Sequence, residues 1–279
     1  AGAYSCLYYC STLRRSYACR YGHQNIRFKN IKSPNGFIFK IFGSCSIRLD
    51  GGEPSVYPAF IDLIATVSKQ HLLQINTNLS FDIESFIKVV RPDTVRIDAS
   101  FHPEYTTLED FLYKILTLNE NGFKIVVSVV AYPHFLDKIR EYKQPFEIRH
   151  IPFIIHPFSG DFNGKNYPRA YEMCEVSKIY SLDEASRLIM GWRKGEKNIT
   201  KGKLCRMGQI YGRIYPSGDV YRCCAEGGML KIGNILDDAF QLLDDALECG
   251  SENCPCWKCM IIDEEVRWTS LWLDEWEMP

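Results

Sequence analysis

Short apolar, β-branched runs alternate with helical patterns between Phe37 and Phe158. Six runs predict strands: Phe37 to Phe42, Ser46 to Leu49, Leu73 to Asn76, Thr94 to Asp98, Lys124 to Val130 and Phe153 to His156. Four segments between them place apolar residues at helical spacing: Pro58 to Gln70, Ile83 to Val90, Thr107 to Asn121 and Phe135 to Tyr142. This alternation predicts an α/β fold with a parallel sheet and right-handed crossovers.

The pattern changes after Gly160. Residues 161–203 are largely polar, with one predicted helix from Leu182 to Trp192. The segment from Ile210 to Tyr221 predicts a hairpin whose turn is Pro216-Ser217-Gly218-Asp219. We therefore predict a core over residues 1–160, a connecting segment over 161–200, and a small C-terminal extension with a final helix over 201–279.

Polar side chains follow several of the predicted strands. In parallel α/β folds, ligands bind at the carboxyl ends of the strands. The residues at those ends are Glu53, Asn76, Thr77, Asn78, Asp98, Ser100, His102, Glu104 and His156. The sequence thus predicts one polar edge of the sheet as the functional edge.

The turn Gly51-Gly52-Glu53-Pro54 is the most informative of these segments. Its two glycines let the backbone bend and approach a ligand closely, since no Cβ stands in the way. Pro54 fixes its own φ and favours an extended conformation for Glu53, which presents the carboxylate at the strand end. Taken alone, an ordinary strand-to-helix loop explains the turn equally well.

Composition and charge bear on the class of partner and on the cellular location of the protein. The 279 residues include 33 Lys plus Arg and 34 Asp plus Glu, a formal net charge of -1, without long basic runs. Charge therefore gives no support for a nucleic-acid or membrane-surface partner. No apolar run reaches the roughly 18–20 residues of a membrane span, and the start AGAYSCLYYC lacks the features of a signal peptide. We expect a soluble cytoplasmic protein.

The 12 cysteines gather at the two ends of the chain. Without an export signal, this number favours metal or cluster ligation over disulfides. The first group is Cys6, Cys10 and Cys19; the last is Cys205, Cys223, Cys224, Cys249, Cys254, Cys256 and Cys259. Only Cys45 and Cys174 lie between, and for both we expect a buried thiol that packs as a small apolar group. The distribution predicts two metal sites that flank a scaffold.

The C-terminal spacing predicts a four-thiolate site. Cys205 and Cys223 lie at the two ends of the hairpin region, and Cys256-Trp-Lys-Cys259 supplies two further thiols. Cys254 is the nearest substitute, and Cys224 and Cys249 are spare or alternative ligands. Four thiolates hold zinc or an iron–sulfur cluster, and spacing alone does not choose between them.

In this order, the motifs resemble those of the radical S-adenosylmethionine (SAM) superfamily, in particular members with a SPASM or twitch-type auxiliary-cluster extension. The resemblance covers about residues 1–260. The matching segments are Asp50-Gly51-Gly52-Glu53-Pro54, Asn76-Thr77-Asn78, the hairpin from Cys205 through Gly218 to Cys223 with Ile232-Gly233-Asn234-Ile235 after it, and the first cysteine group. It implies a partial (β/α)6 TIM-like barrel followed by a small cysteine-rich hairpin extension.

The resemblance also implies cofactors and roles. A four-iron four-sulfur (4Fe-4S) cluster held by three thiolates would cleave SAM to a 5'-deoxyadenosyl radical, with electrons from a partner such as flavodoxin or ferredoxin. Gly51, Gly52, Glu53 and Pro54 would hold the SAM amino group. The other implied contacts are Asn78 and Ser100 for the SAM carboxylate or ribose, 127–130 and His156 for the adenine edge, and Asn76 as a further cofactor-binding residue. A second, fully ligated 4Fe-4S cluster on Cys205, Cys223, Cys256 and Cys259 would serve electron transfer or structure.

The N-terminal cysteines depart from the family pattern. That pattern separates three cysteines by three and then two residues, whereas here Leu13 stands where the third would fall after Cys6-Leu-Tyr-Tyr-Cys10. Three explanations stay open. The loop is altered and uses Cys6, Cys10 and Cys19; a ligand lies upstream of Ala1, where the family also has its first strand; or the chain does not bind the catalytic cluster.

The substrate is less well specified. His102, Glu104 and Tyr132 are candidate catalytic residues, although loop packing also explains them. With only a short connection between core and tail, we expect a small molecule or sugar as substrate, with a peptide- or protein-modifying maturase as the alternative. A non-catalytic, metal-stapled barrel that binds a ligand or partner is a second alternative, and a barrel hydrolase or lyase ranks last. Trp268, Trp272 and Trp276 recur at helical spacing and predict a packing stripe or a dimer or partner face.

Overall fold

The structure is a computed structural model that describes most of the chain. The described residues are 6–10, 45–50, 52–183, 186, 200–209, 211–215, 217–223, 227–237 and 240–252, without the side chains of 6–10 and 50. The predicted strand Phe37 to Phe42, nearly all of the predicted helix Leu182 to Trp192, and the tryptophans 268, 272 and 276 lie outside these residues.

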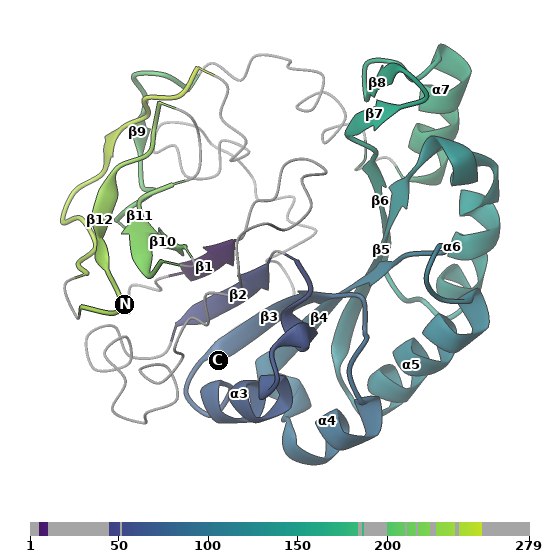
Figure 1. Cartoon of the computed structure of the whole chain (residues 1–279), viewed down its shortest axis with the longest axis horizontal. Coiled ribbons are helices and arrows are strands. Elements are labelled where there is room, and N and C mark those ends of the chain that lie inside the picture. Colours follow the sequence, from purple (N-terminus) through teal and green to yellow (C-terminus); the bar gives the residue numbers. More distant parts are fainter. Residues whose placement is uncertain are drawn as a thin grey trace.

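One curved sheet organises the molecule (Figure 1). Its strand order is β12-β11-β10-β1-β2-β3-β4-β5-β6, and β1 to β6 run parallel in sequence order. These strands are β1 (Cys6–Cys10), β2 (Ser46–Asp50), β3 (Leu72–Thr77), β4 (Val95–Phe101), β5 (Lys124–Ala131) and β6 (Phe153–Pro157). Within the described residues the sheet has two edges, β6 and β12, so it is a partial barrel as predicted.

The crossover helices lie along the outer face of this sheet, as Figure 1 shows. They are α3 (Phe60–Val67), α4 (Ile83–Val89), α5 (Leu108–Glu120) and α6 (Ile139–Glu147), with short 3-10 helices at η1 (Pro54–Val56), η2 (Pro92–Thr94) and η3 (Pro133–Lys138). The predicted helix from Phe135 to Tyr142 is thus corrected to a 3-10 turn followed by α6. Pro133 opens that turn, because its fixed φ suits the first helical position.

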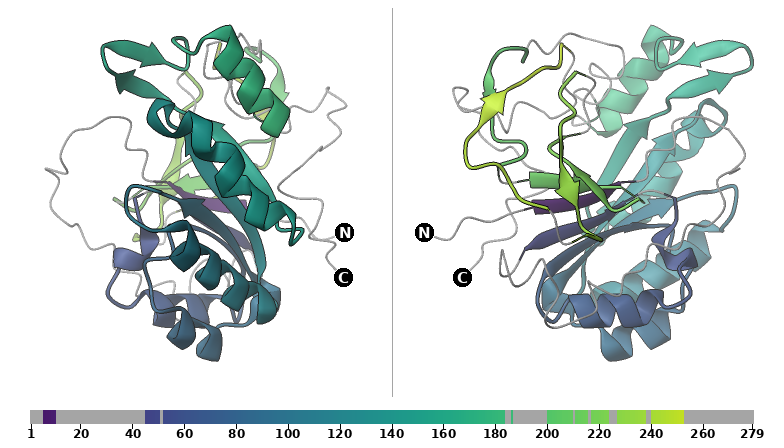
Figure 2. Two further views of the ribbon diagram at one scale, coloured as in Figure 1. Left: turned by 90° about the vertical axis from the view of Figure 1, so that its right-hand side faces the viewer. Right: turned by 60° about the vertical axis from the view of Figure 1, so that its left-hand side comes forward.

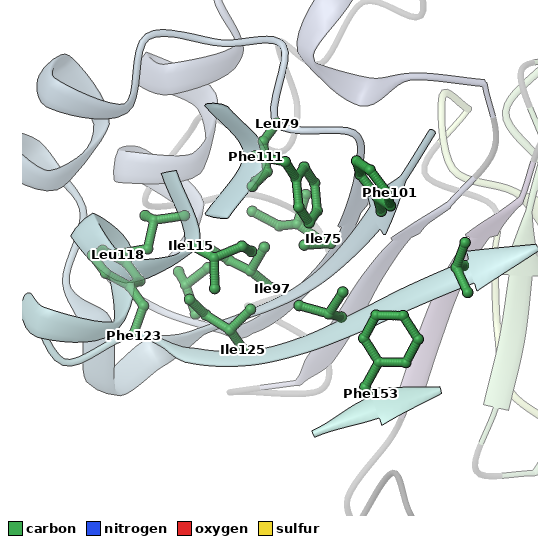
Figure 3. Packing of buried hydrophobic residues seen from close by; sticks show 14 of the residues in the cluster. Ile75, Leu79, Ile97, Phe101, Phe111, Ile115, Leu118, Phe123, Ile125 and Phe153 are labelled. Carbon is green, nitrogen blue, oxygen red and sulfur yellow. The ribbon is translucent and has the colours of Figure 1, made fainter. Parts of the chain in front are cut away.

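Strand alternation separates an apolar outer face from a polar inner face. Ile75, Ile97 and Ile125 point outward from β3, β4 and β5 and pack against Phe111 and Ile115 of α5 (Figure 3). Burial of each such side chain contributes about 1.5–3 kcal/mol, so this layer fixes the strand register. The intervening residues of the same strands therefore face the inside of the partial barrel.

The cap of α5 holds the loop that follows β4. The Thr107 hydroxyl accepts a hydrogen bond from the Asp110 amide (3.1 Å) and donates one to the Asp110 carboxylate (2.7 Å). We expect Thr107→Ala to lower the free energy of unfolding by about 1 kcal/mol, because the Asp110 amide loses its partner. Thr106→Ala is the matched control, since its hydroxyl reaches only the Thr107 carbonyl at 3.5 Å. Urea unfolding measures both variants, and equal effects would contradict the role of the cap.

The C-terminal extension continues the same sheet. β10 (Tyr211–Ile214) pairs parallel with β1, and β11 (Asp219–Tyr221) and β12 (Lys231–Asn234) follow antiparallel. These strands confirm the predicted hairpin, although its place beside β1 was not predicted. A separate two-stranded sheet pairs β9 (Leu204–Cys205) with β13 (Leu247–Glu248).

Two elements of the connecting segment were missed by the sequence prediction. β7 (Gly160–Phe162) and β8 (Lys165–Tyr167) form a hairpin around Asn163-Gly164, a dipeptide that favours tight turns. Helix α7 (Met173–Leu182) follows, with a capping box between Glu172 and Glu175. Both lie side by side beyond the carboxyl end of β6 (Figures 1 and 2). None of the described helices is long and apolar enough to cross a membrane.

Candidate cofactor and substrate site

Glu53 joins the carboxyl ends of β2 and β3. Its Oε1 accepts hydrogen bonds from the Ser55 amide (3.0 Å) and the Thr77 hydroxyl (2.7 Å), and its Oε2 accepts one from the Asn78 amide (2.6 Å). The side chain is half-buried. These donors stabilise the charged carboxylate and fix its position, so the predicted presentation of Glu53 at the strand end is what the structure shows.

The adjoining loops hold this arrangement. Gly52 has φ +49°, in the left-handed region that favours glycine. The Asn78 side-chain carbonyl accepts from the Ser80 amide (3.0 Å), and the Ser80 hydroxyl lies 2.8 Å from that of Ser55. The carbonyl of Asn78, a predicted ligand contact, is therefore engaged in its own turn. Gly51 lies outside the described residues.

One acceptor position of the Glu53 carboxylate remains open. A carboxylate has about four lone-pair positions, and the three donors above occupy two on Oε1 and one on Oε2. Within the described residues no cation pairs with it. A fixed carboxylate with one open acceptor position fits an ammonium group, which supplies N–H donors and the opposite charge.

A row of polar side chains continues along the inner face. The Ser100 hydroxyl donates to the side-chain carbonyl of Asn76 (3.1 Å) and lies 3.3 Å from the Ser128 hydroxyl. The structure thus brings the predicted residues Asn76 and Ser100 together. His156 is half-buried near the end of β6, where its register partner is Val130.

The predicted adenine edge at 127–130 needs a correction. Val127 and Val129 are 0% and 2% exposed and pack in the outer core. Of these four residues, the alternation of β5 leaves only Ser128 and Val130 on the inner face. The run of apolar residues hid this alternation, because both faces of a central parallel strand carry apolar side chains.

Asp98 centres a buried polar group deeper on the same face. Its Oδ2 accepts from the Gln74 amide group (2.6 Å), and guanidinium nitrogens of Arg48 and Arg96 lie 3.6 Å from its oxygens. Asp98 and Arg96 are each 3% exposed. Buried ionic groups of this kind need partners, so Asp98 offsets positive charge inside the barrel.

A pocket of about 420 Å³ opens at the ends of β4, β5 and β6. All three candidate catalytic residues, His102, Glu104 and Tyr132, line it. The remaining wall is mainly apolar and consists of Phe101, Pro103, Val130, Phe135, Phe158 and Ser159. Their roles stay predictions, but the structure places the three in one cavity of the size typical for small ligands.

Aromatic contacts fix one wall of this pocket. The Tyr132 ring packs edge-on against Phe158, with centroids 4.8 Å apart, and against Phe162 of β7 at 4.9 Å. The Phe158 amide donates to the Tyr171 hydroxyl (2.9 Å), which in turn donates to the Ala131 carbonyl. The β7–β8 hairpin therefore supports the pocket, a role that no sequence pattern predicted.

Solved structures of known enzymes have the same architecture. anSMEcpe with bound AdoMet (that is, SAM) matches over 86% of this chain and 81% of its own, with a TM-score of 0.54 and 13% sequence identity. SuiB of Streptococcus suis bound to S-adenosylmethionine matches over 84% of this chain and 64% of its own, with a TM-score of 0.50 and 16% identity. Both are radical SAM enzymes. The chain has the radical SAM fold. No protein-family model and no curated protein matches the sequence.

Within this radical SAM fold, the backbone at the first cysteine pair differs from the expected loop. Cys6 and Cys10 are the first and last residues of β1, opposite Ser46 and Asp50 of β2. At about 3.3 Å per residue, their Cα atoms lie about 13 Å apart. Only Cys10 ends at the carboxyl edge near Glu53, and the sharing of one cluster by Cys6 and Cys10 stays a prediction. Cys19 lies outside the described residues.

Three of the C-terminal cysteines lie within the described residues. Cys205, Cys223 and Cys249 are all buried, at 4%, 7% and 7% exposure. A Cβ on Gly250 would lie 1.9 Å from the Gly227 carbonyl, so the Cys249 loop touches the loop that follows Cys223. Within the described residues no three metal-ligating side chains converge. Cys224, Cys254, Cys256 and Cys259 lie outside those residues.

The two cysteines between the terminal groups behave differently from each other. Cys45 is 2% exposed and packs in the core, as predicted. Cys174 is exposed, which corrects the expectation that it packs as a buried apolar group. It lies in the first turn of α7, whose buried side consists of Val176, Ile179 and Leu182.

Proposed function

We propose that the chain is a radical SAM enzyme that binds SAM at the carboxyl edge of β2 to β4. The observation that carries the proposal is the Glu53 carboxylate, fixed by three hydrogen bonds and left with one open acceptor position. The solved structures with this fold bind AdoMet, which supports the same ligand here. When bound, the cluster and SAM supply the 5'-deoxyadenosyl radical that abstracts hydrogen from a substrate.

The residues of the chain bind and orient. Glu53 accepts an N–H from the ammonium group of SAM, and the Thr77 hydroxyl and Asn78 amide hold the carboxylate in place. The Ser100 and Ser128 hydroxyls, 3.3 Å apart, present a small polar surface to the carboxylate or ribose. Preorganised donors and acceptors of this kind need no rearrangement when the ligand binds.

Thiolates are the expected cluster ligands. Cys10, at the carboxyl end of β1, is the described residue best placed for the catalytic cluster, with Cys19 as a further candidate. For the auxiliary cluster we retain Cys205, Cys223, Cys256 and Cys259, with Cys254 as substitute and zinc as the alternative metal. The burial of Cys249 beside this region makes it a second substitute. A flavodoxin or ferredoxin is the proposed electron donor.

The pocket at His102, Glu104 and Tyr132 is the proposed substrate site. Its volume of about 420 Å³ favours a small molecule or a sugar. Its aromatic wall also suits a single peptide side chain. A peptide substrate is the alternative, since anSMEcpe has been solved with a bound Cp18Cys peptide as well as AdoMet.

One observation favours a different class of function. Cys6 and Cys10 lie at opposite ends of β1, with Cα atoms about 13 Å apart, which argues against one cluster held by both. A non-catalytic barrel stapled by metal at its C-terminal end, which binds a ligand or partner, would also have this arrangement.

Metal analysis separates the two functions. We expect anaerobically purified chain to contain about eight irons and matching sulfide for two clusters, or about four if only one is present. Zinc without iron would contradict the enzymatic proposal and support the stapled barrel.

A further inference from the structure

Arg213 lies on the inner face of the partial barrel. Its Cα pairs with that of Tyr8 in β1, and Tyr8 pairs with Arg48 in β2, so Arg213 and Arg48 share one row. The next residue, Ile214, belongs to the hydrophobic core on the other face. Because successive strand residues alternate between faces, the guanidinium of Arg213 faces the interior.

Two nitrogens of this guanidinium are buried without a hydrogen-bond partner. Arg213 is 5% exposed, and its Nε and Nη2 make no hydrogen bond although water does not reach them. Its Cζ lies 5.5 Å from the centroid of the Tyr215 ring. Within the described residues no carboxylate approaches it. A buried charge without partners is costly, so the site is incomplete as it stands.

Arg222, nearby in the chain, shows what a satisfied buried arginine looks like in this protein. It is also 5% exposed, and its Nε donates to the Met207 carbonyl at 2.9 Å. Its two terminal nitrogens donate to three further carbonyls, those of Cys205, Leu247 and Glu248. The two arginines are equally buried, but Arg222 has a carbonyl acceptor for each guanidinium nitrogen, whereas Nε and Nη2 of Arg213 have none.

The charges around Arg213 belong to other pairs. Arg48 lies two strands away, about 10 Å at the usual strand spacing, and contacts Asp98. On the neighbouring β11, the Asp219 carboxylate pairs with Lys231 at 2.6 Å and accepts from Asn234 at 2.9 Å. The interior therefore has positive charge that no described carboxylate near Arg213 offsets.

We propose that Arg213 anchors a buried oxyanion site. The two unpartnered nitrogens, Nε and Nη2, lie on the same edge of the planar guanidinium, and this edge donates two parallel hydrogen bonds to a carboxylate or phosphate. The ligand is an anionic group of a molecule held inside the partial barrel, either the substrate or SAM itself. Only this naming of the ligand rests on the proposed function.

Thermal unfolding of the full chain tests the site without cluster or SAM. At constant ionic strength, we expect inorganic phosphate to raise the Tm of the unsubstituted protein. Arg213→Met should raise the Tm in phosphate-free buffer by about 2–8 °C, because it removes an uncompensated buried charge, and should abolish the phosphate response. Arg222→Met, the matched control, should lower the Tm. An Arg213→Met protein that melts earlier than the unsubstituted chain, or that keeps the phosphate response, would overturn the proposal.

A charge-preserving variant guards against a folding defect. Arg213→Lys keeps the cation but loses the bidentate edge, so its phosphate response should be reduced and not abolished.

Binding of two nucleosides then identifies the source of the anion. If Arg213→Met weakens binding of S-adenosylhomocysteine tenfold or more but leaves 5'-methylthioadenosine unchanged, the group is the carboxylate of SAM. If both bind as before while the phosphate response is lost, the group belongs to the substrate.

Discussion

Glu53→Gln is expected to lower the rate of 5'-deoxyadenosine formation about 100-fold. The amide removes the charge that attracts the ammonium of SAM. It also turns an N–H₂ group toward donors, since Thr77 and the amides of Ser55 and Asn78 all donate to the carboxylate. The loss of the charge-assisted hydrogen bond and the clash between the new N–H₂ group and the surrounding donors together cost about 3 kcal/mol. This energy corresponds to a rate decrease of about 100-fold.

The same variant should weaken SAM binding measured by calorimetry. Glu120→Gln is its control, because Glu120 is exposed at the end of α5, just before β5 begins, and so lies at the amino ends of the strands. We expect the control to keep both the rate and the affinity. Equal rates for Glu53→Gln and Glu120→Gln would show that Glu53 does not bind the cofactor.

Arg222→Met is expected to lower the free energy of unfolding by about 3–5 kcal/mol, because the buried carbonyls of Met207 and Cys205 and the partly buried carbonyls of β13 lose their charged donor. For a chain of this size the Tm should fall by about 6–15 °C. The affected region includes Cys205 and Cys249, so we also expect less iron bound by the C-terminal site.

Arg206→Met is the control for this second prediction. Arg206 is exposed and adjoins Cys205, so its substitution should change stability by less than about 0.5 kcal/mol. Urea unfolding followed by circular dichroism measures all three proteins. Coincident midpoints for the two variants would contradict the role of Arg222 as the link between β9, β13 and β11.

The sequence predicted the parallel sheet well because local patterns determine its strands. Ser46 to Asp50 and Lys124 to Ala131 are bounded as expected to within one or two residues. The Glu53 turn was also readable, since Gly-Gly-Glu-Pro after a strand restricts both backbone and charge. Local patterns do not predict pairing between segments that are distant in the sequence, such as that of β10 with β1.

The interior of the barrel was least predictable. Asp98 was recognised only as a strand-end residue, whereas its contacts with Gln74, Arg48 and Arg96 depend on three strands in register. Arg213 gave no sign in the sequence, because a single arginine in a hairpin is ordinarily exposed. The β7–β8 hairpin was signalled by Asn163-Gly164, but polar flanking residues concealed its role under the pocket.

The most direct test of the central claim is product analysis of the unsubstituted chain. The protein is purified anaerobically, its iron–sulfur content is restored, and it is reduced with dithionite in the presence of SAM. We predict that 5'-deoxyadenosine and methionine form in equal amounts and that Glu53→Gln forms about 100-fold less. An iron-loaded, reduced protein that leaves SAM intact would contradict the account.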